Sequence, residues 1–134
     1  MENQIVVVAG IISNRDQFLI VQRSLDPSDL QPGLWEFPGG KVKYGESPEK
    51  ALIREINEEL AIPIHTLDIY DVTSGMFDDI HAIMILYHCK TDTRDIDLRV
   101  GSDYSWISPA QLAEFKFAKL DIPVVRRMIT ELSE

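Results

Sequence analysis

Three glutamates near the middle of the chain are spaced so that their carboxylates can act together. If a helix begins after Ser47 and each residue advances about 100°, Glu55, Glu58 and Glu59 fall within an arc of about 100°. Like charges at these spacings repel, and negative charge near the C-terminal end of a helix opposes the helix dipole. Stability therefore does not explain the cluster. Carboxylates that face one point are ligands that Mg²⁺ or Mn²⁺ prefers, so these residues indicate a metal site.

A solvated acidic face is the alternative interpretation of any glutamate-rich helix. The flanking residues oppose it, because they follow a fixed spacing. Five residues separate Gly40 from Glu46, and seven more precede the run Arg54-Glu55-Ile56-Asn57-Glu58-Glu59, which Ile62 closes. This spacing resembles the signature of the Nudix hydrolases at every fixed position except the last glycine, which is Ala61 here.

The segment LWEFPGGK at residues 34–41 resembles the MutT-like branch of this family, whose members cleanse nucleoside triphosphate pools. The likeness extends from residues 5–12 to Asp121-Ile122-Pro123 and so covers almost the whole chain. It implies one Nudix hydrolase domain over residues 1–134, of the α/β (α+β) class. The implied fold is an α/β/α sandwich around a mixed β-sheet.

The resemblance also implies a reaction, in which a Mg²⁺- or Mn²⁺-dependent enzyme cleaves (deoxy)nucleoside triphosphates to the monophosphate and pyrophosphate. Water attacks a phosphorus of the diphosphate linkage, which requires charge neutralisation on the phosphoryl oxygens and an activated water. The expected substrate is CTP or a modified dCTP, or a nucleotide like 8-oxo-dGTP. The expected role is sanitising of the nucleotide pool.

By the same resemblance, the expected metal ligands are the carbonyl oxygen of Gly39 and the carboxylates of Glu55, Glu58 and Glu59. Glu55 and Glu58 are also expected to be catalytic, together with Arg54. A guanidinium group suits a bidentate contact that fixes a carboxylate of the signature. An exposed salt bridge on the helix is the simpler alternative for Arg54.

The other signature residues are Gly40 and Glu46. Gly40 lets the backbone approach an ion and phosphates closely. Glu46 completes the metal cage or orients a ligand. As an ordinary glutamate near a helix N-terminus, it needs neither role.

Substrate contacts are expected from Arg23, at the end of a strand, and Lys41, after the glycine pair, both directed at phosphate, with a solvated surface position as the alternative for each. Asp121 matches a position where relatives place Asn or Asp against the base, and a carboxylate there favours an edge that presents N–H groups. The alternative role of Asp121 is an N-cap for the last helix. Phe37, with Trp35, walls the base pocket or belongs to the core.

MutT-like enzymes often supply one further glutamate from a loop ahead of the strand that carries Trp106. That position is Val100 in this chain. Asp97 and Asp103 are neighbouring candidates, so the identity of the catalytic base stays open.

Two other functions fit the same signature. An ADP-ribose or dinucleoside polyphosphate hydrolase is the nearest, although residues 75–78 lack the proline typical of ADP-ribose-cleaving relatives. A non-catalytic module that senses a nucleotide is the other. Such modules usually have eroded signatures, whereas this chain keeps all its glutamates and Arg54.

Composition and charge limit which molecules the protein is expected to bind and in which compartment it is expected to occur. The formal charge of −9 opposes binding of nucleic-acid polymers, which requires clustered Lys and Arg. No apolar run approaches the about 20 residues that span a bilayer. The single cysteine, Cys89, suits a reducing cytoplasm. We therefore expect a cytoplasmic monomer or homodimer whose partner is a small nucleotide.

The periodicity predicts a strand hairpin, a central helix, further strands and a last helix. The central helix is expected to start after Ser47 and to end at Ala61, in a turn that is either slightly strained or reshaped by Pro63. The expected extended segments are residues 4–12, 17–22, 35–37, 41–43, 66–74, 80–90 and 104–107. A short helix is expected after Ser108, and the last helix after Asp121.

Overall fold

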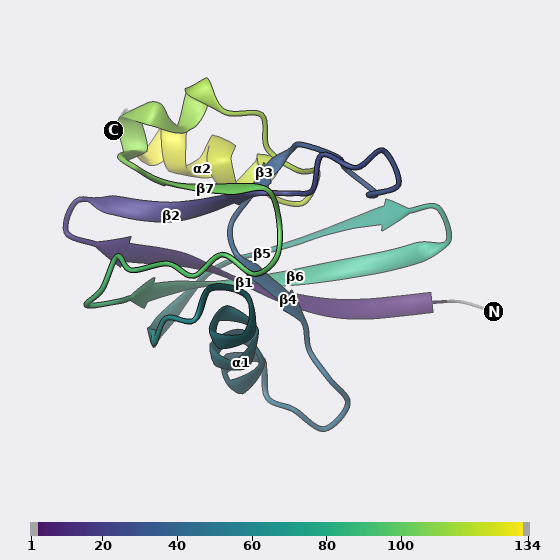
Figure 1. The fold of residues 1–134 in the computed structure, drawn as a ribbon. Coiled ribbons are helices and arrows are strands. Elements are labelled where there is room, and N and C mark those ends of the chain that lie inside the picture. Colours follow the sequence, from purple (N-terminus) through teal and green to yellow (C-terminus); the bar gives the residue numbers. More distant parts are fainter. Residues whose placement is uncertain (1–2, 133–134) are drawn as a thin grey trace.

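The computed structural model describes residues 3–132, so the expected domain limits at residues 1 and 134 lie outside the described residues. Strands and helices follow one another along the described chain (Figure 1). They are β1 (Asn3–Asn14), β2 (Gln17–Gln22), β3 (Trp35–Glu36), β4 (Gly39–Lys41), α1 (Pro48–Leu60), β5 (His65–Phe77), β6 (Ile80–Lys90), β7 (Asp103–Ile107), the 3₁₀-helix η1 (Pro109–Glu114) and α2 (Ile122–Leu132).

A mixed β-sheet forms the centre of the molecule, with the strand order β3-β2-β1-β6-β5. β1 runs parallel to β6 and antiparallel to β2 and β4, and β7 joins β2. β1 and β2 pair next to their connecting turn, where Ser13 faces Phe18. Farther along, β2 pairs with β3 while β1 pairs with β4. The chain from β3 to β4 therefore crosses from one strand to the other.

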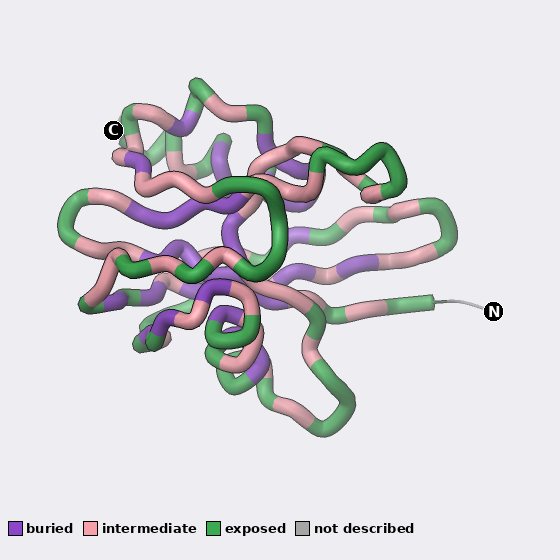
Figure 2. The backbone as a smooth tube through the Cα atoms, in the orientation of Figure 1, coloured by how far each residue is buried: buried purple, intermediate pink, exposed green. Residues whose placement is uncertain are grey.

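Alternation along the strands sends side chains to two cores, one on each face of the sheet. On one face, Ile11 and Ile20 share a core with Val124 of α2. On the other face, Leu19 shares a core with Leu52 of α1. Figure 1 shows α1 on one side of the sheet and α2 with η1 on the other, which confirms the expected α/β/α sandwich. Buried segments follow the central strands, whereas the hairpin ends are exposed (Figure 2).

β4 begins two residues before the expected extended segment at residues 41–43, because the glycine pair is itself the strand. Gly39 pairs with Ala9 of β1. A Cβ atom on Gly39 would lie 1.8 Å from the carbonyl oxygen of Val8, so only glycine permits this approach. Pro38 alone forms the bend that precedes β4.

α1 begins and ends as the sequence indicates. The Ser47 hydroxyl accepts a hydrogen bond from the N–H of Lys50 at 3.3 Å, which caps the first turn. Ala61 follows the last turn in the left-handed conformation, with φ 55°. Its N–H donates to the carbonyl oxygen of Asn57 at 3.1 Å. The expected strained turn at Ala61 is therefore confirmed.

Replacing Ala61 by Gly is expected to raise the free energy of unfolding by up to about 1 kcal/mol, measured by chemical denaturation. A left-handed residue other than glycine costs about 1–2 kcal/mol, and the greater freedom of glycine in the unfolded chain cancels part of the gain. Ala51→Gly in the buried face of α1 is the matched control and should lower stability. A lower free energy of unfolding for Ala61→Gly than for wild type would contradict the claim that the left-handed conformation of Ala61 is strained.

Other elements differ from expectation mainly in length. β5 continues to Phe77, beyond the expected residues 66–74, because its pairing with β6 runs on to a tight turn in which Asp78 has φ 53°. β6 spans residues 80–90 as expected. Ser108 opens η1 in a capping box with Gln111. Within residues 3–132, no helix is long and apolar enough to cross a membrane.

Candidate active site

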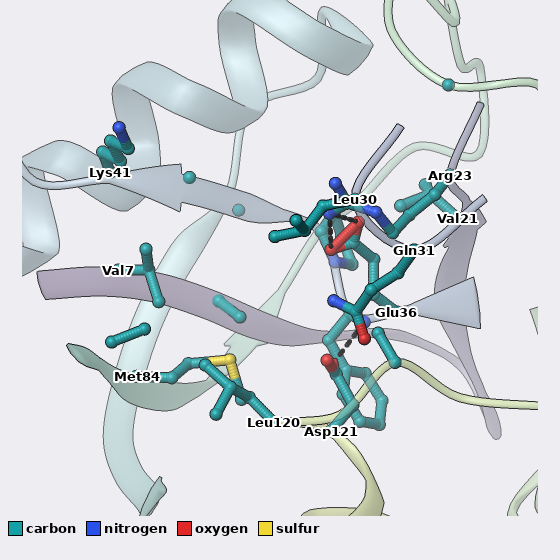
Figure 3. Close-up of a pocket in the computed structure, with 18 of the residues that line it drawn as sticks. Val7, Val21, Arg23, Leu30, Gln31, Glu36, Lys41, Met84, Leu120 and Asp121 are labelled. Atoms are coloured by element: carbon teal, nitrogen blue, oxygen red, sulfur yellow. Dashed lines mark hydrogen bonds and ion pairs between the residues drawn. The ribbon is translucent and has the colours of Figure 1, made fainter. Parts of the chain in front are cut away.

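A cavity of about 390 Å³ opens where β1 and β2 separate, a size typical of small-molecule sites. Its lining includes Gly39 and Gly40 of β4, and Glu59 of α1. Figure 3 shows Lys41 on one side of this cavity and Asp121 on the other. The cavity therefore joins the signature helix to the segment that precedes α2.

The signature glutamates lie against the glycine strand. A Cβ atom on Gly40 would lie 2.4 Å from the carboxylate of Glu55, so this carboxylate fills space that only a glycine leaves open. Glu59 lines the cavity, and the Glu58 side chain is 53% exposed. α1 thus places the Glu55 carboxylate against β4 and Glu59 at the cavity, whereas Glu58 is largely exposed.

Arg54 connects the charged residues of the signature. Its guanidinium makes a bidentate contact with Glu46, with N–O distances of 2.7 and 2.9 Å. It also donates to Glu55 at 3.0 Å, to Glu58 at 3.2 Å and to the carbonyl oxygen of Lys41 at 3.0 Å. Arg54 lowers the pKa of Glu46 to about 2. The bidentate contact expected of Arg54 is present, and its partner is Glu46.

Negative charge is concentrated on the cavity side of α1. Burial, and then the carboxylate of Glu55, raise the pKa of Glu59 to about 8, and Glu36 and Glu58 add to this effect. Like-charge repulsion of this kind is relieved when a divalent cation lies between the carboxylates.

The donor groups fit Mg²⁺, because they are hard oxygen ligands beside a glycine strand that leaves room for Glu55. Among residues 3–132, however, no three carboxylate, imidazole or thiol groups converge as a ready cage. Arg54 engages both Glu55 and Glu58. Arg54 holds only Oε1 of Glu55 and Oε2 of Glu58, so the other oxygen of each carboxylate stays available to a cation.

The loop before β7 covers the C-terminal end of α1. The N–H groups of Asp97 and Arg99 donate to the carbonyl oxygens of Leu60 and Glu59, at 3.1 and 2.8 Å. This loop thereby places Val100 in the cavity wall.

The two aspartates that were candidates for the catalytic base lie outside the cavity. The Asp97 carboxylate pairs with Arg99 at 3.0 Å, and the Asp103 carboxylate accepts a hydrogen bond from the N–H of Tyr104. Neither aspartate lines the cavity. The open question of the catalytic base is therefore not answered by these two residues.

A second charged network borders the cavity away from α1. The Arg23 guanidinium binds Asp29 at 2.9 and 3.2 Å and Glu36 at 3.0 Å. Burial raises the pKa of Glu36, and Arg23 opposes that rise. Arg23 lines the cavity, as a substrate-binding residue must, but its guanidinium is already held by two carboxylates. The phosphate contact of Arg23 stays a prediction.

Sequence reasoning did not select Glu36 as a site residue. Its signal was a single charged residue between two large aromatic residues, Trp35 and Phe37, in a short strand. Such a residue is placed in an apolar setting, where a carboxylate needs a partner or a function.

Asp121 is buried, with 4% of its surface exposed, and its Oδ1 accepts a hydrogen bond from the N–H of Phe37 at 3.0 Å. α2 begins at Ile122, so Asp121 does occupy the N-cap position, and its carbonyl oxygen accepts from Val125. Its side chain, however, bonds to Phe37 across the cavity wall (Figure 3). The side-chain cap expected as the alternative for Asp121 is not formed, because its carboxyl group accepts from the N–H of Phe37 and not from an N–H of α2.

Replacing Asp121 by Asn is expected to change how stability depends on pH. Burial, and then the charge of Glu36, raise the pKa of Asp121 well above its ordinary value. The folded state therefore keeps a proton that the unfolded chain releases, and stability falls as pH rises above about 4. Asn does not titrate, so the melting temperature of Asp121→Asn relative to wild type should increase between about pH 4 and 7.

Asp16→Asn, in the exposed turn between β1 and β2, is the matched control for these thermal melts. Its melting temperature relative to wild type should change less over the same range. A constant difference for Asp121→Asn would show that the buried carboxyl group is not protonated.

The aromatic residues divide between core and cavity. Phe37 is 2% exposed and stacks on Phe117 with ring centroids 5.7 Å apart, although it also contributes to the cavity wall. Trp35 packs edge-on against Phe115 and is not part of that wall. Lys41 lines the cavity, in a position to meet an anion.

Comparisons with known proteins give the same class of protein as this fold and site, a hydrolase of diphosphate bonds. The NUDIX domain family model matches residues 3–128, and the chain therefore belongs to the NUDIX family.

The CTP pyrophosphohydrolase of Escherichia coli (strain K12) is 36% identical over 126 residues, which cover 90% of this chain and 88% of that protein. The 8-oxo-dGTP diphosphatase of Proteus vulgaris is 33% identical over 97 residues, which cover 72% of this chain and 85% of that protein. The crystal structure of the MutT protein from Methanosarcina mazei Go1 matches with a TM-score of 0.87 at 25% identity. The match covers 99% of this chain and 98% of that chain.

Proposed function

We propose that the chain hydrolyses CTP or a closely related cytosine nucleotide, including a modified dCTP, in a role that sanitises the nucleotide pool. The broader activity is plain, since the chain is a NUDIX hydrolase that acts on the diphosphate bonds of nucleoside triphosphates. The base preference is the proposal.

The buried carboxyl group of Asp121 carries this proposal. One of its oxygens is bonded to the N–H of Phe37, and its raised pKa favours the protonated form. A protonated carboxyl group presents a donor beside an acceptor. The donor can bond to ring N3 of cytosine, and the acceptor can receive a hydrogen bond from its 4-amino group. The 36% identity to a protein named CTP pyrophosphohydrolase supports the same preference.

The carboxylates of Glu55, Glu58 and Glu59, with the carbonyl oxygen of Gly39, would hold Mg²⁺. When bound, the ion supplies charge neutralisation at the phosphates and an acidified water. Arg54 orients Glu46, Glu55 and Glu58 by the bonds described above.

At the reacting phosphorus, a bond to the water oxygen forms and the bond to the bridging oxygen breaks, so that the nucleoside monophosphate and pyrophosphate separate. We assign the water proton to Glu55, whose carboxylate lies against Gly40. Lys41 lines the cavity and would supply positive charge near the phosphate chain, and Arg23 would do so where phosphate replaces Asp29 or Glu36 as its partner. Oriented charges of this kind stabilise the transition state.

A panel of nucleotides tests the base preference. Pyrophosphate release from CTP, dCTP, 5-methyl-dCTP, 8-oxo-dGTP and the other common triphosphates should give the highest kcat/KM for a cytosine nucleotide. A higher value for 8-oxo-dGTP would overturn that preference while keeping the activity. Turnover of only ADP-ribose or dinucleoside polyphosphates would select the nearest alternative, and binding without any turnover would indicate a sensor module.

We also propose a cytoplasmic monomer or homodimer that does not bind nucleic-acid polymers. The single cysteine, Cys89, leaves the chain without an internal disulfide, which suits a reducing compartment. The charge of −9 supports the absence of polymer binding. Light scattering of the purified protein distinguishes monomer from dimer.

A further inference from the structure

Gln31 is held firmly in the loop between β2 and β3, at the edge of the cavity. Its N–H donates to Oδ2 of Asp29 at 3.0 Å, and its carbonyl oxygen accepts from the N–H of Leu34 at 3.3 Å. Asp29 is itself bound to Arg23 by two hydrogen bonds. The backbone of Gln31 therefore needs no ligand to reach its position.

The side-chain amide of Gln31 has a defined orientation. Its Oε1 accepts a hydrogen bond from the backbone N–H of Lys119 at 2.8 Å, and only the oxygen of an amide can accept. The NH₂ group is thus on the other side. Within residues 3–132, no protein group accepts a hydrogen bond from it.

Gln31 is one of the residues that line the cavity. Asp121, which comes from the turn before α2, is another. Figure 3 shows the Gln31 side chain reaching from its loop toward the side of the cavity where Asp121 lies. Two polar groups from distant parts of the sequence therefore border the same space.

We propose that Gln31 determines base specificity by donating a hydrogen bond from its amide NH₂ group to a carbonyl oxygen of the nucleobase. This inference rests on the proposed function, since it assumes that the base occupies the cavity beside Asp121. Cytosine presents an amino group, ring N3 and the 2-carbonyl oxygen along one edge. Asp121 meets the first two of these groups, and Gln31 meets the third.

The proposed bond separates bases by one chemical feature. Cytosine, uracil and guanine each carry a carbonyl oxygen, whereas adenine carries none. A site whose donor is left without an acceptor discriminates strongly, because the unpaired polar group loses its water on binding. Adenine nucleotides should therefore be poor substrates, and Gln31 should be one reason.

Gln31→Glu is the decisive variant, because a carboxylate keeps the acceptor for the Lys119 N–H and replaces the NH₂ group by an oxygen. The wild-type protein with Mg²⁺ and the variant are compared by kcat/KM for CTP and for ATP. We expect kcat/KM for CTP to fall at least about tenfold, while that for ATP falls much less or rises. The ratio of the two values is the readout.

Gln31→Met removes both polar atoms at nearly constant size and should also lower the CTP-to-ATP ratio. Gln4→Glu, at an exposed position of β1, adds the same charge away from this cavity and should leave the ratio unchanged. Thermal melts show whether each variant folds. If Gln31→Glu fails to fold, the affinities of Gln31→Met for CMP and for AMP, each relative to wild type, replace the kinetic comparison.

An equal loss for CTP and ATP would overturn the proposal and leave Gln31 as a structural link to Lys119. A wild-type enzyme that prefers ATP would also overturn it. A wild-type protein that hydrolyses no nucleoside triphosphate would instead refute the proposed function, so the two failures are distinguishable.

Discussion

Glu58→Gln is expected to lower kcat at least about 100-fold, because one charged ligand of the proposed metal site is lost at nearly constant size. Pyrophosphate release under saturating substrate measures the loss. The fold should survive, since the Glu58 side chain is 53% exposed and Arg54 keeps its contacts with Glu46 and Glu55. Removing a like charge near the C-terminal end of α1 favours the helix slightly.

Glu49→Gln is the matched control for Glu58→Gln. Glu49 lies in the first turn of the same helix, away from the cavity, and its substitution removes the same charge. We expect kcat to stay within about twofold of wild type for this control, because it retains every proposed ligand. A Glu58→Gln enzyme as active as the Glu49→Gln enzyme would refute the assignment of Glu58 as a ligand.

Removal of divalent cations is expected to abolish turnover. The carboxylates of Glu55, Glu58 and Glu59 lie close on one helix, and burial first, then the charge of Glu55, raises the pKa of Glu59. EDTA should stop pyrophosphate release, and Mg²⁺ or Mn²⁺ should restore it. Ca²⁺ should restore it poorly, because it prefers more ligands at longer distances than Mg²⁺ does.

A second measurement separates metal binding from catalysis. Mg²⁺ should raise the melting temperature of the wild-type protein, because an ion that binds only the folded state stabilises it. The Glu49→Gln control should respond like wild type, and Glu58→Gln should respond less. Full turnover in EDTA would exclude this metal site. So would melting temperatures that Mg²⁺ leaves unchanged in all three proteins.

The elements of the fold were largely predictable because their signals are local. Continuous apolar runs rich in β-branched residues locate β1 and β2, and the limits of β6 were predicted to the residue. Ser47 and Ala61 mark the two ends of α1. β4 was misplaced because the need for glycine there comes from a neighbouring strand: the carbonyl oxygen of Val8 lies where a Cβ atom of Gly39 would be.

The candidate site was predictable where its residues share one helix. A helix sets the relative directions of side chains three and four residues apart, so the spacing of Glu55, Glu58 and Glu59 already places them on one face. The signature also indicated that Arg54 makes a bidentate contact with a carboxylate. It did not indicate that the partner is Glu46, eight residues away.

The sequence by itself determined the family resemblance, the carboxylate face of α1 and most element boundaries, since all of these depend on residues close together in the chain. Tertiary structure alone decided that Asp121 bonds to Phe37, that Glu36 pairs with Arg23 and that Gln31 faces the cavity. Phe37 and Asp121 are 84 residues apart. No periodicity encodes such a pair, because its geometry arises only when the sheet brings β3 beside the start of α2.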